Sequence, residues 1–159
     1  MSYTPAIITI LDEVEARFGN ISVTNGYVHE FKKVERAKME PFKGYDLPAI
    51  NYYLGRTSSE RDNYGSWLHS TNLIVEAHHK TRDDPFTDIA SSLDSDIAIC
   101  LFRATLKPKV TDTVDICLGG LVEDLKYDGF SPFINVGEKP FCGARIELTI
   151  VSSTNIGEM

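Results

Sequence analysis

Phe141-Cys142-Gly143-Ala144-Arg145-Ile146-Glu147-Leu148-Thr149-Ile150-Val151 is the stretch that decides the fold of this 159-residue chain. Its apolar residues, Cys142, Ala144, Ile146, Leu148 and Ile150, alternate with Gly143, Arg145, Glu147 and Thr149. Because side chains on a strand point to opposite faces in turn, this alternation predicts a strand with one face in the core. The other face meets solvent or a partner.

Other segments carry weaker strand signals. Leu47–Leu54 lies between Gly44 and Gly55, and residues 67–78 have three consecutive apolar residues at their centre, which indicates cover on both faces. Residues 121–134 predict a strand that is interrupted near Asp128-Gly129. Residues 27–39 fit either a helix or a strand, and their β-branched and aromatic content favours a strand. Residues 56–66 are polar and predict a loop.

Two segments have the apolar spacing of helices. Thr4 and Pro5 form a helix start, and Ile7, Ile10, Leu11, Val14 and Phe18 follow at three- and four-residue steps before Gly19. Asp84 before Pro85 predicts the start of a longer helix, with the Asp84 carboxylate accepting from first-turn amides. An apolar stripe from Phe86 to Leu101 continues that helix, which ends before Lys107-Pro108. The predicted fold is one α+β domain over residues 1–159, in which two main helices pack on a mostly antiparallel or mixed sheet of about four to five strands.

Composition narrows the class of protein. A chain that is 42% hydrophobic, without a low-complexity block, is long enough to bury one core. It has no apolar run that could cross a bilayer and no signal peptide, so we expect a cytoplasmic site of synthesis and no membrane partner. Cys100, Cys117 and Cys142 are widely spaced among apolar residues, which indicates buried thiols in a reducing compartment.

The charge balance disfavours a nucleic-acid-binding surface. The formal net charge is −7, whereas affinity for phosphates requires clustered Lys and Arg. Lys32, Lys33, Arg36 and Lys38 form a local basic cluster, but Glu30, Glu35 and Glu40 lie among them. Such interleaving is typical of a solvated face.

The stretch "IVEAHHKTRDDP", residues 74–85, raises the question of a metal site. Successive residues of a strand face opposite sides, so His78 and His79 could share an ion only if the strand had already ended. In that case His79, Asp83 and Asp84 could bind zinc or manganese, with His29 or His69 completing the site. The alternative is that these residues only form the polar junction between a strand and a helix. We favour this alternative and therefore expect no metal and no cofactor.

Other catalytic patterns are weak. Three pairs of carboxylates could in principle serve as a catalytic acid and base. Asp94 and Asp96 fall on the expected polar side of the second helix, and the strand residues Glu123 and Asp124 point away from each other. The third pair is Asp112 with Asp115. The chain has no Gly-x-Ser-x-Gly motif, and no cysteine lies in a basic setting that favours a thiolate. Gly119-Gly120 lacks a phosphate-loop continuation and predicts a bend or bulge.

Two segments carry residue types that favour contacts with other proteins. Residues 55–66 are more than a hairpin connection needs, and they carry Arg56, Arg61 and Tyr64 next to Trp67, which are residue types enriched at interfaces. Residues 126–139 display Tyr127 and Phe130, with Phe133, among glycines and prolines. We take Arg56, Arg61, Tyr64, Trp67, Tyr127 and Phe130 as candidate interface residues. A merely structural role for both segments is the alternative.

The order of elements resembles a known family. An amphipathic helix precedes Asn25-Gly26-Tyr27, Asp46-Leu47-Pro48-Ala49-Ile50 opens a strand, and the strand "LIVEAHH" leads to the helix "DPFTDIASSLDSDIAICLF" and a final strand pair. This order resembles the tail terminator and tail-completion proteins of long-tailed bacteriophages and prophages.

The resemblance implies a non-enzymatic virion protein, commonly a hexameric ring, that is assembled in the host cytoplasm. It would cap the head-proximal end of the tail tube and bind the tube protein and the head-completion or neck proteins. DNA would pass through the ring only in transit. A role in a capsid or head-completion step would depend on the same kind of assembly contacts. The alternative from another class of protein is a small metal-dependent hydrolase using His78 or His79 with Asp83 or Asp84.

Overall fold

The structure is a computed structural model that describes residues 6–61, 65–81, 84–103, 114–137 and 140–155. Its elements, in chain order, are α1 (Ala6–Phe18), β1 (Lys33–Arg36), the short 3₁₀ helix η1 (Gly44–Asp46), β2 (Ala49–Arg61), β3 (Ser66–Lys80), α2 (Phe86–Phe102), the 3₁₀ helix η2 (Leu118–Gly120), β4 (Asp124–Asn135) and β5 (Phe141–Asn155).

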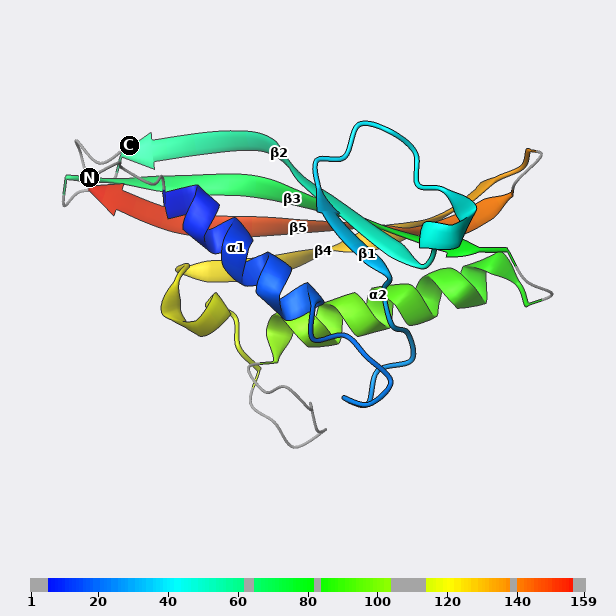
Figure 1. The fold of residues 1–159 in the computed structure, drawn as a ribbon. Coiled ribbons are helices and arrows are strands. Elements are labelled where there is room, and N and C mark those ends of the chain that lie inside the picture. Colours follow the sequence, from blue (N-terminus) through cyan, green and yellow to red (C-terminus); the bar gives the residue numbers. More distant parts are fainter. Residues whose placement is uncertain (1–5, 62–64, 82–83, 104–113, 138–139, 156–159) are drawn as a thin grey trace, which may run out of the picture.

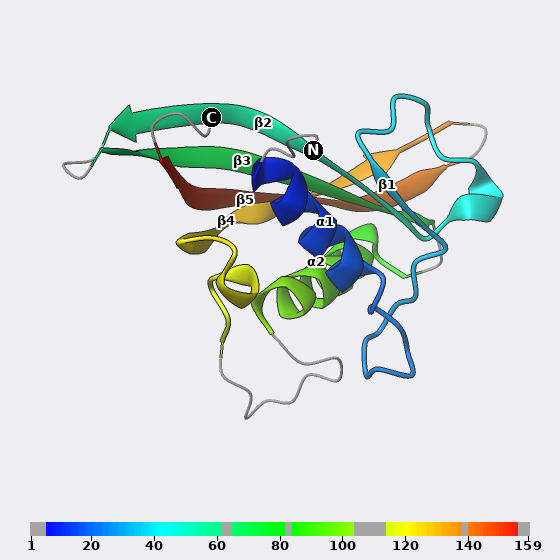
Figure 2. The same cartoon turned by 60° about the vertical axis from the view of Figure 1, so that its left-hand side comes forward.

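The strands form one sheet in the order β1-β2-β3-β5-β4. β1 runs parallel to β2, and the other neighbouring pairs are antiparallel. Figures 1 and 2 show α1 and α2 on the same side of this sheet. The predicted α+β class, with two main helices on a mixed sheet, is confirmed.

β5 and β3 make the centre of the sheet, and they pair along their whole lengths. The predicted alternation in β5 is confirmed, since its core-facing residues Cys142, Ala144, Ile146, Leu148 and Ile150 are fully buried. On β3, Leu73 and Val75 are also fully buried, but Ile74 is only half-buried. The prediction that both faces of this segment are covered is therefore wrong, because both helices pack on the other side.

α1 buries the face that the sequence predicts, whereas the start of α2 differs from the prediction. α1 buries Ile10, Leu11, Val14 and Phe18 as predicted, while Thr4 and Pro5 lie outside the described residues. α2 does not use Asp84 as its cap, which corrects the prediction. Pro85 takes that position in an extended conformation, and its carbonyl accepts the amides of Asp88 and Ile89. Asp84 is exposed one residue further out.

Strand boundaries differ most from the predictions in the polar segments. Residues 56–61 continue β2 and Ser66 already belongs to β3, so the predicted loop at 56–66 is wrong. Ser, Thr and charged residues there are held by the backbone ladder to β3, which needs no apolar alternation. In residues 27–39 only Lys33–Arg36 forms a strand. The predicted interruption of β4 is confirmed as a register shift between Tyr127 and Gly129.

Before β4, the turn at Gly119-Gly120 is confirmed. Both glycines lie in η2 and have positive φ angles of 70° and 94°. An L side chain is strained in this left-handed region, which explains why glycine occupies both positions.

Arg17 joins the two helices to the segment before η2. Arg17 is buried, and its guanidinium donates to the carbonyl of Leu101 at 2.9 Å and to Asp115 Oδ2 at 2.9 Å. It also pairs with Glu13. A cation at the last turn of α2 satisfies a free carbonyl and complements the helix dipole. Burial opposes ionisation of Asp115, but Arg17 and the amides of Cys117 and Gly119 outweigh it and lower the pKa of Asp115.

Asp96 lies inside the fold rather than on the polar side of α2, which corrects the prediction. Asp96 is only 2% exposed. Its carboxylate accepts hydrogen bonds from the backbone amides of Val28 at 3.1 Å and His29 at 2.8 Å. Burial raises the pKa of Asp96, although the two amides act against that shift. The carboxyl group therefore fastens the connection between α1 and β1 to the middle of α2.

We predict that Asp96→Ala lowers the free energy of unfolding by about 1–3 kcal/mol, because it leaves amides in a partly buried place without an acceptor. Denaturant unfolding followed by circular dichroism measures this loss. Ser91→Ala, on the exposed side of the same helix, is the control and changes stability by less than about 0.5 kcal/mol. Equal stability of both variants would contradict the fastening role of Asp96.

Candidate interaction surfaces

The first surface is the far half of the β2–β3 hairpin, residues 55–61 and 66–70, which we call the arm. Figure 2 shows the arm extending past both helices, so that no described helix lies under its tip. Residues 55–61 are all exposed, and residues 66–70 are half-buried. The arm thus offers two faces and one edge of a sheet to solvent.

Polar side chains, rather than a hydrophobic core, tie the arm to β5. His69 contacts Ser59 Oγ through Nδ1 at 2.7 Å and Thr154 Oγ1 through Nε2 at 2.8 Å. Nearer the core, the hydroxyl oxygens of Thr57 and Thr71 lie 3.0 Å apart. These bonds cross three strands, so the arm is an ordered extension of the sheet.

The candidate interface residues fall into two groups. Arg56, Arg61 and Trp67 belong to the arm, where Arg61 pairs with Trp67 across the hairpin. Tyr64 lies outside the described residues.

The second group is on β4, at the opposite edge of the sheet. Tyr127 is 41% exposed, and its hydroxyl donates to Asp94 at 2.6 Å. Burial, followed by the neighbouring Asp94 carboxylate, raises the pKa of the Tyr127 phenol. Phe130 packs against the core opposite Ile146. The structure therefore pairs Arg61 with Trp67, places Arg56 further along the same hairpin, and separates all three from Tyr127 and Phe130.

The two edges of the sheet differ in how they are protected. β1 covers β2 only from Ala49 to Tyr52, which leaves the rest of that edge without a strand partner in the described chain. β4 is the other edge, and it carries Pro132, which has no amide to donate, and a bulge at Gly129 with φ of 126°. Proline and bulges disfavour the pairing of further strands, so both features protect the β4 edge. The β2 edge also has a register shift, between Leu54 and Thr57, but from Thr57 to Arg61 it is regular and contains no proline.

The uncovered face of the sheet carries an aromatic cluster, formed by Phe42, His78, Phe133 and Phe141. The His78 ring centroid lies 5.3 Å from those of Phe42 and Phe133 and 5.5 Å from that of Phe141. Gly143 pairs with both His78 and Phe133 and lets them meet above its backbone. A Cβ at Gly143 would lie 2.7 Å from the Phe133 ring and would also collide with the Ala77 carbonyl. Glycine is therefore required there.

Next to this cluster the same face is ionic. Tyr53 donates to Glu76 Oε1 at 2.7 Å, and Arg145 Nη1 lies 3.1 Å from the Tyr53 hydroxyl and 3.3 Å from Glu76. Arg145 also contacts Glu147. These charges are partly exposed, so they orient one another more than they stabilise the fold.

His78 and His79 do not face a common ion. β3 continues to Lys80, so their side chains lie on opposite faces of the sheet. His79 is buried on the helix side, 5.2 Å from the His29 ring, and its Nδ1 lies 2.8 Å from the Lys80 carbonyl oxygen. Asp83 lies outside the described residues.

The remaining predicted ligands are also apart. Within the described ranges, no group of three or more His, Cys, Asp or Glu side chains has the geometry of a metal site. His69 is in the arm, and Asp84 is exposed near the start of α2. Among the described residues, the histidines and Asp84 of the hydrolase alternative therefore do not converge on one site.

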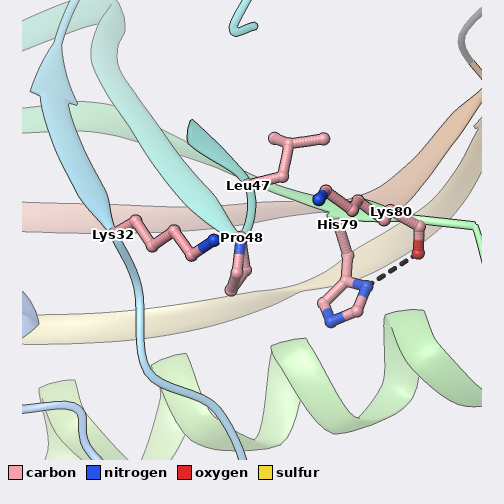
Figure 3. A pocket seen from close by; sticks show the side chains of 5 residues that line it. All are labelled: Lys32, Leu47, Pro48, His79 and Lys80. Carbon is pink, nitrogen blue, oxygen red and sulfur yellow. Dashed lines mark hydrogen bonds between the residues drawn. The ribbon is translucent and has the colours of Figure 1, made fainter. Parts of the chain in front are cut away.

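Two hollows flank the start of β2 and the end of β3. The first, about 240 Å³, is lined by Lys32, Leu47, Pro48, His79 and Lys80. Figure 3 shows Lys32 and Lys80 reaching toward the Leu47–Pro48 segment, while the His79 ring points toward α2. The second, about 610 Å³, shares Leu47 and Lys80 and adds aromatic residues around η1. Both are open and carry no paired acid and base for catalysis in the part of the chain that is described.

The predicted basic cluster is partly neutralised. Arg36 pairs with Asp12 at 2.8 Å and donates to the Tyr52 hydroxyl, and the Lys38 ammonium lies over the Phe42 ring. Lys32 and Lys33 are exposed. This arrangement agrees with a solvated face.

The predicted carboxylate pairs do not act together in the described residues. Asp94 faces Tyr127 whereas Asp96 points inward, and Glu123 accepts from Ser153. Asp115 is held by Arg17, and Asp112 lies outside the described residues.

The cysteines are free and mostly buried. Cys100 and Cys142 are buried as predicted, and Cys117 is half-buried. Burial raises the pKa of the Cys100 thiol to about 12, so it remains protonated and packs as an apolar side chain.

Comparison of the chain with protein-family models and with curated proteins gives no match. Neither helix of the described chain has the length and apolar character that crossing a bilayer requires.

The aromatic cluster predicts a pH dependence of stability. Burial lowers the pKa of His78 below its ordinary value of 6.5, although Glu76, 3.7 Å away, acts in the opposite direction. Below pH 6.5 the unfolded chain then binds more protons than the folded one, so stability falls as the pH falls, by at most about 1.4 kcal/mol per pH unit from this group.

We therefore expect the free energy of unfolding of His78→Phe to fall less than that of the unsubstituted protein when the pH is lowered below 6.5. Denaturant titrations above and below this value measure the difference. Parallel losses in both proteins would show that protonation of His78 is not coupled to folding.

Proposed function

We propose that this protein is a structural virion assembly protein that caps the head-proximal end of a phage tail tube, as an oligomeric ring, and joins the tube to the neck. The order of its elements supports this role through the resemblance to tail terminators. The observation that carries the proposal is the arm, an ordered piece of sheet that no described helix covers.

Physical features of the arm fit assembly by contact. An exposed strand edge can add a strand from a neighbour through main-chain hydrogen bonds, and Arg and Trp are the residues that most often dominate binding energy. Arg56 and Arg61 belong to the edge strand β2, and Arg61 pairs with Trp67 of β3. In the proposed ring the arm contacts the neighbouring subunit or the tube protein, and DNA passes only in transit. The net charge of −7 suits such passage, because an acidic lumen does not retain phosphates.

Purified tail tubes test the proposal directly. We expect negative-stain images to show the protein at one end of each tube and not along its length. Failure to bind tubes, or binding along the whole tube, would contradict a capping role.

The arm gives a sharper prediction. Arg61→Glu is expected to weaken tube capping by at least about tenfold, because charge reversal at an interface arginine removes a major contact. Lys33→Glu, a charge reversal at an exposed residue of β1 outside both candidate surfaces, is the control and leaves capping unchanged. Equal effects of both variants would show that overall charge, and not the arm, governs capping.

A further inference from the structure

We propose that the larger of the two hollows, with the smaller one adjoining it, is a docking groove for an extended segment of a partner protein that carries carboxylates beside apolar side chains. The groove lies at the end of the β2–β3 hairpin where Ala49 pairs with His78, whereas the arm ends where Arg61 pairs with Trp67. It therefore leaves the arm free for contacts within a ring. This inference goes beyond the capping role and does not depend on it.

The connection between β1 and β2 forms the outer wall of this groove. β1 and β2 are parallel neighbours, so residues 37–48 have to run from the end of β1 back to the start of β2. Figure 1 shows this connection rising on the side of the sheet opposite the helices. Phe42 and Tyr45 from the connection line the larger hollow together with Phe141 from the start of β5. The groove thus has aromatic walls from segments that are distant in sequence.

The apolar lining of the groove is in place before any partner binds. Leu47 lines both hollows and is buried. The ring centroids of Phe42 and Phe141 lie 5.3 and 5.5 Å from that of His78, and these contacts hold two of the walls. Walls that are fixed in advance reduce the entropy that binding costs. Both hollows are also open, so an extended segment can lie along them without being enclosed.

Lysines give the groove a charge opposite to that of the chain as a whole. Lys43 and Lys80 line the larger hollow, Lys32 lines the smaller one, and all three are exposed. Figure 3 shows Lys32 and Lys80 directed toward Pro48. Within the described chain, no Asp or Glu lines either hollow, and none of the three lysines forms an ion pair. Because the net charge is −7, an acidic segment is attracted to this groove and repelled by most of the remaining surface.

Two features favour a peptide over a single strand of nucleic acid. Aromatic residues that bind single strands present free ring faces on which bases stack. Here the Lys38 ammonium lies over the Phe42 ring at 5.5 Å, and the Lys43 ammonium lies over the Tyr45 ring at 5.7 Å. The net charge of −7 also repels a long run of phosphates. A short acidic peptide contacts the lysines without facing the rest of that charge.

A fluorescein-labelled hexapeptide, Glu-Glu-Leu-Phe-Glu-Glu, tests the groove in the full-length chain. Fluorescence anisotropy at low salt is expected to show saturable binding that weakens as salt is added. Lys43→Glu and Lys80→Glu are each expected to weaken binding by at least about tenfold, because each places a like charge beside the peptide. Lys126→Glu is the matched control and leaves binding unchanged, since Lys126 is exposed and pairs with Thr149, far along β5 from the groove.

Two further peptides separate charge from apolar contact. Glu-Glu-Ser-Ser-Glu-Glu keeps the carboxylates and Lys-Lys-Leu-Phe-Lys-Lys keeps the apolar pair, and each is expected to bind at least about tenfold more weakly than the first peptide. Tyr45→Ser removes an aromatic wall that is 68% exposed and weakens binding of the first peptide. Val23→Ser, at an apolar residue that is 65% exposed and lies outside the groove, does not. Circular dichroism checks that each variant is folded.

Several outcomes would overturn the docking groove. They are the absence of saturable binding up to about 1 mM peptide, equal binding by K80E and K126E, equal binding of the serine peptide, and tighter binding of a labelled thymidine hexanucleotide than of the acidic peptide. The capping role is judged separately. A protein that caps tubes but binds no acidic peptide overturns the groove alone, whereas one that binds the peptide in this charge-dependent way but caps no tube overturns the capping role alone.

Discussion

The full-length pairing of β3 with β5 is the constraint on which the rest of the structure depends. Both strands bury the residues of one face under α1 and α2 and leave the other face without a helix. A slip of one residue would turn every core side chain outward, so the register is strongly specified. Gly143 specifies it further, because its backbone lies against the Ala77 carbonyl where no Cβ fits.

The helical layer is shorter than the sheet, and buried polar groups fasten it in place. Arg17 joins α1 to the end of α2, and Asp96 holds the α1–β1 connection to its middle. These bonds sit in partly or fully desolvated places, where unpaired groups are costly. The helices therefore stay over the inner part of the sheet, and the arm projects beyond them as the surface open to partners.

Sequence patterns predicted the elements whose apolar spacing is regular. α1, α2 and β5 follow from periodicity because their core faces are continuous, whereas β3 was predicted from the apolar run at its centre. The β2 half of the arm was predicted as a loop because residues 56–61 are polar and their ladder leaves no apolar signature. Asp96 was misplaced for a related reason, since an acidic residue on a helix normally indicates the solvent side.

The candidate surface was predicted in part. Arg56, Arg61 and Trp67 were selected by residue type and belong to one hairpin, but only Arg61 and Trp67 are paired neighbours. The cluster around His78 could not be predicted, because it depends on the pairing of Gly143 with two different strands. A glycine at an outward position of an otherwise regular strand was the only local signal. The residues that pair with this glycine are distant in sequence.

That distance has a consequence for biogenesis. Lys80 and Phe141 are partners at one end of the central ladder, yet the segment between them contains α2, η2 and β4. Closing so long a loop costs entropy before any contact is regained, and such topologies fold slowly. A nascent chain halted before residue 141 lacks the strand that fills the middle of the sheet. Such a chain would expose the apolar sides of β3 and α2 together. We therefore expect arrested translation products of this protein to bind chaperones that hold unfolded chains.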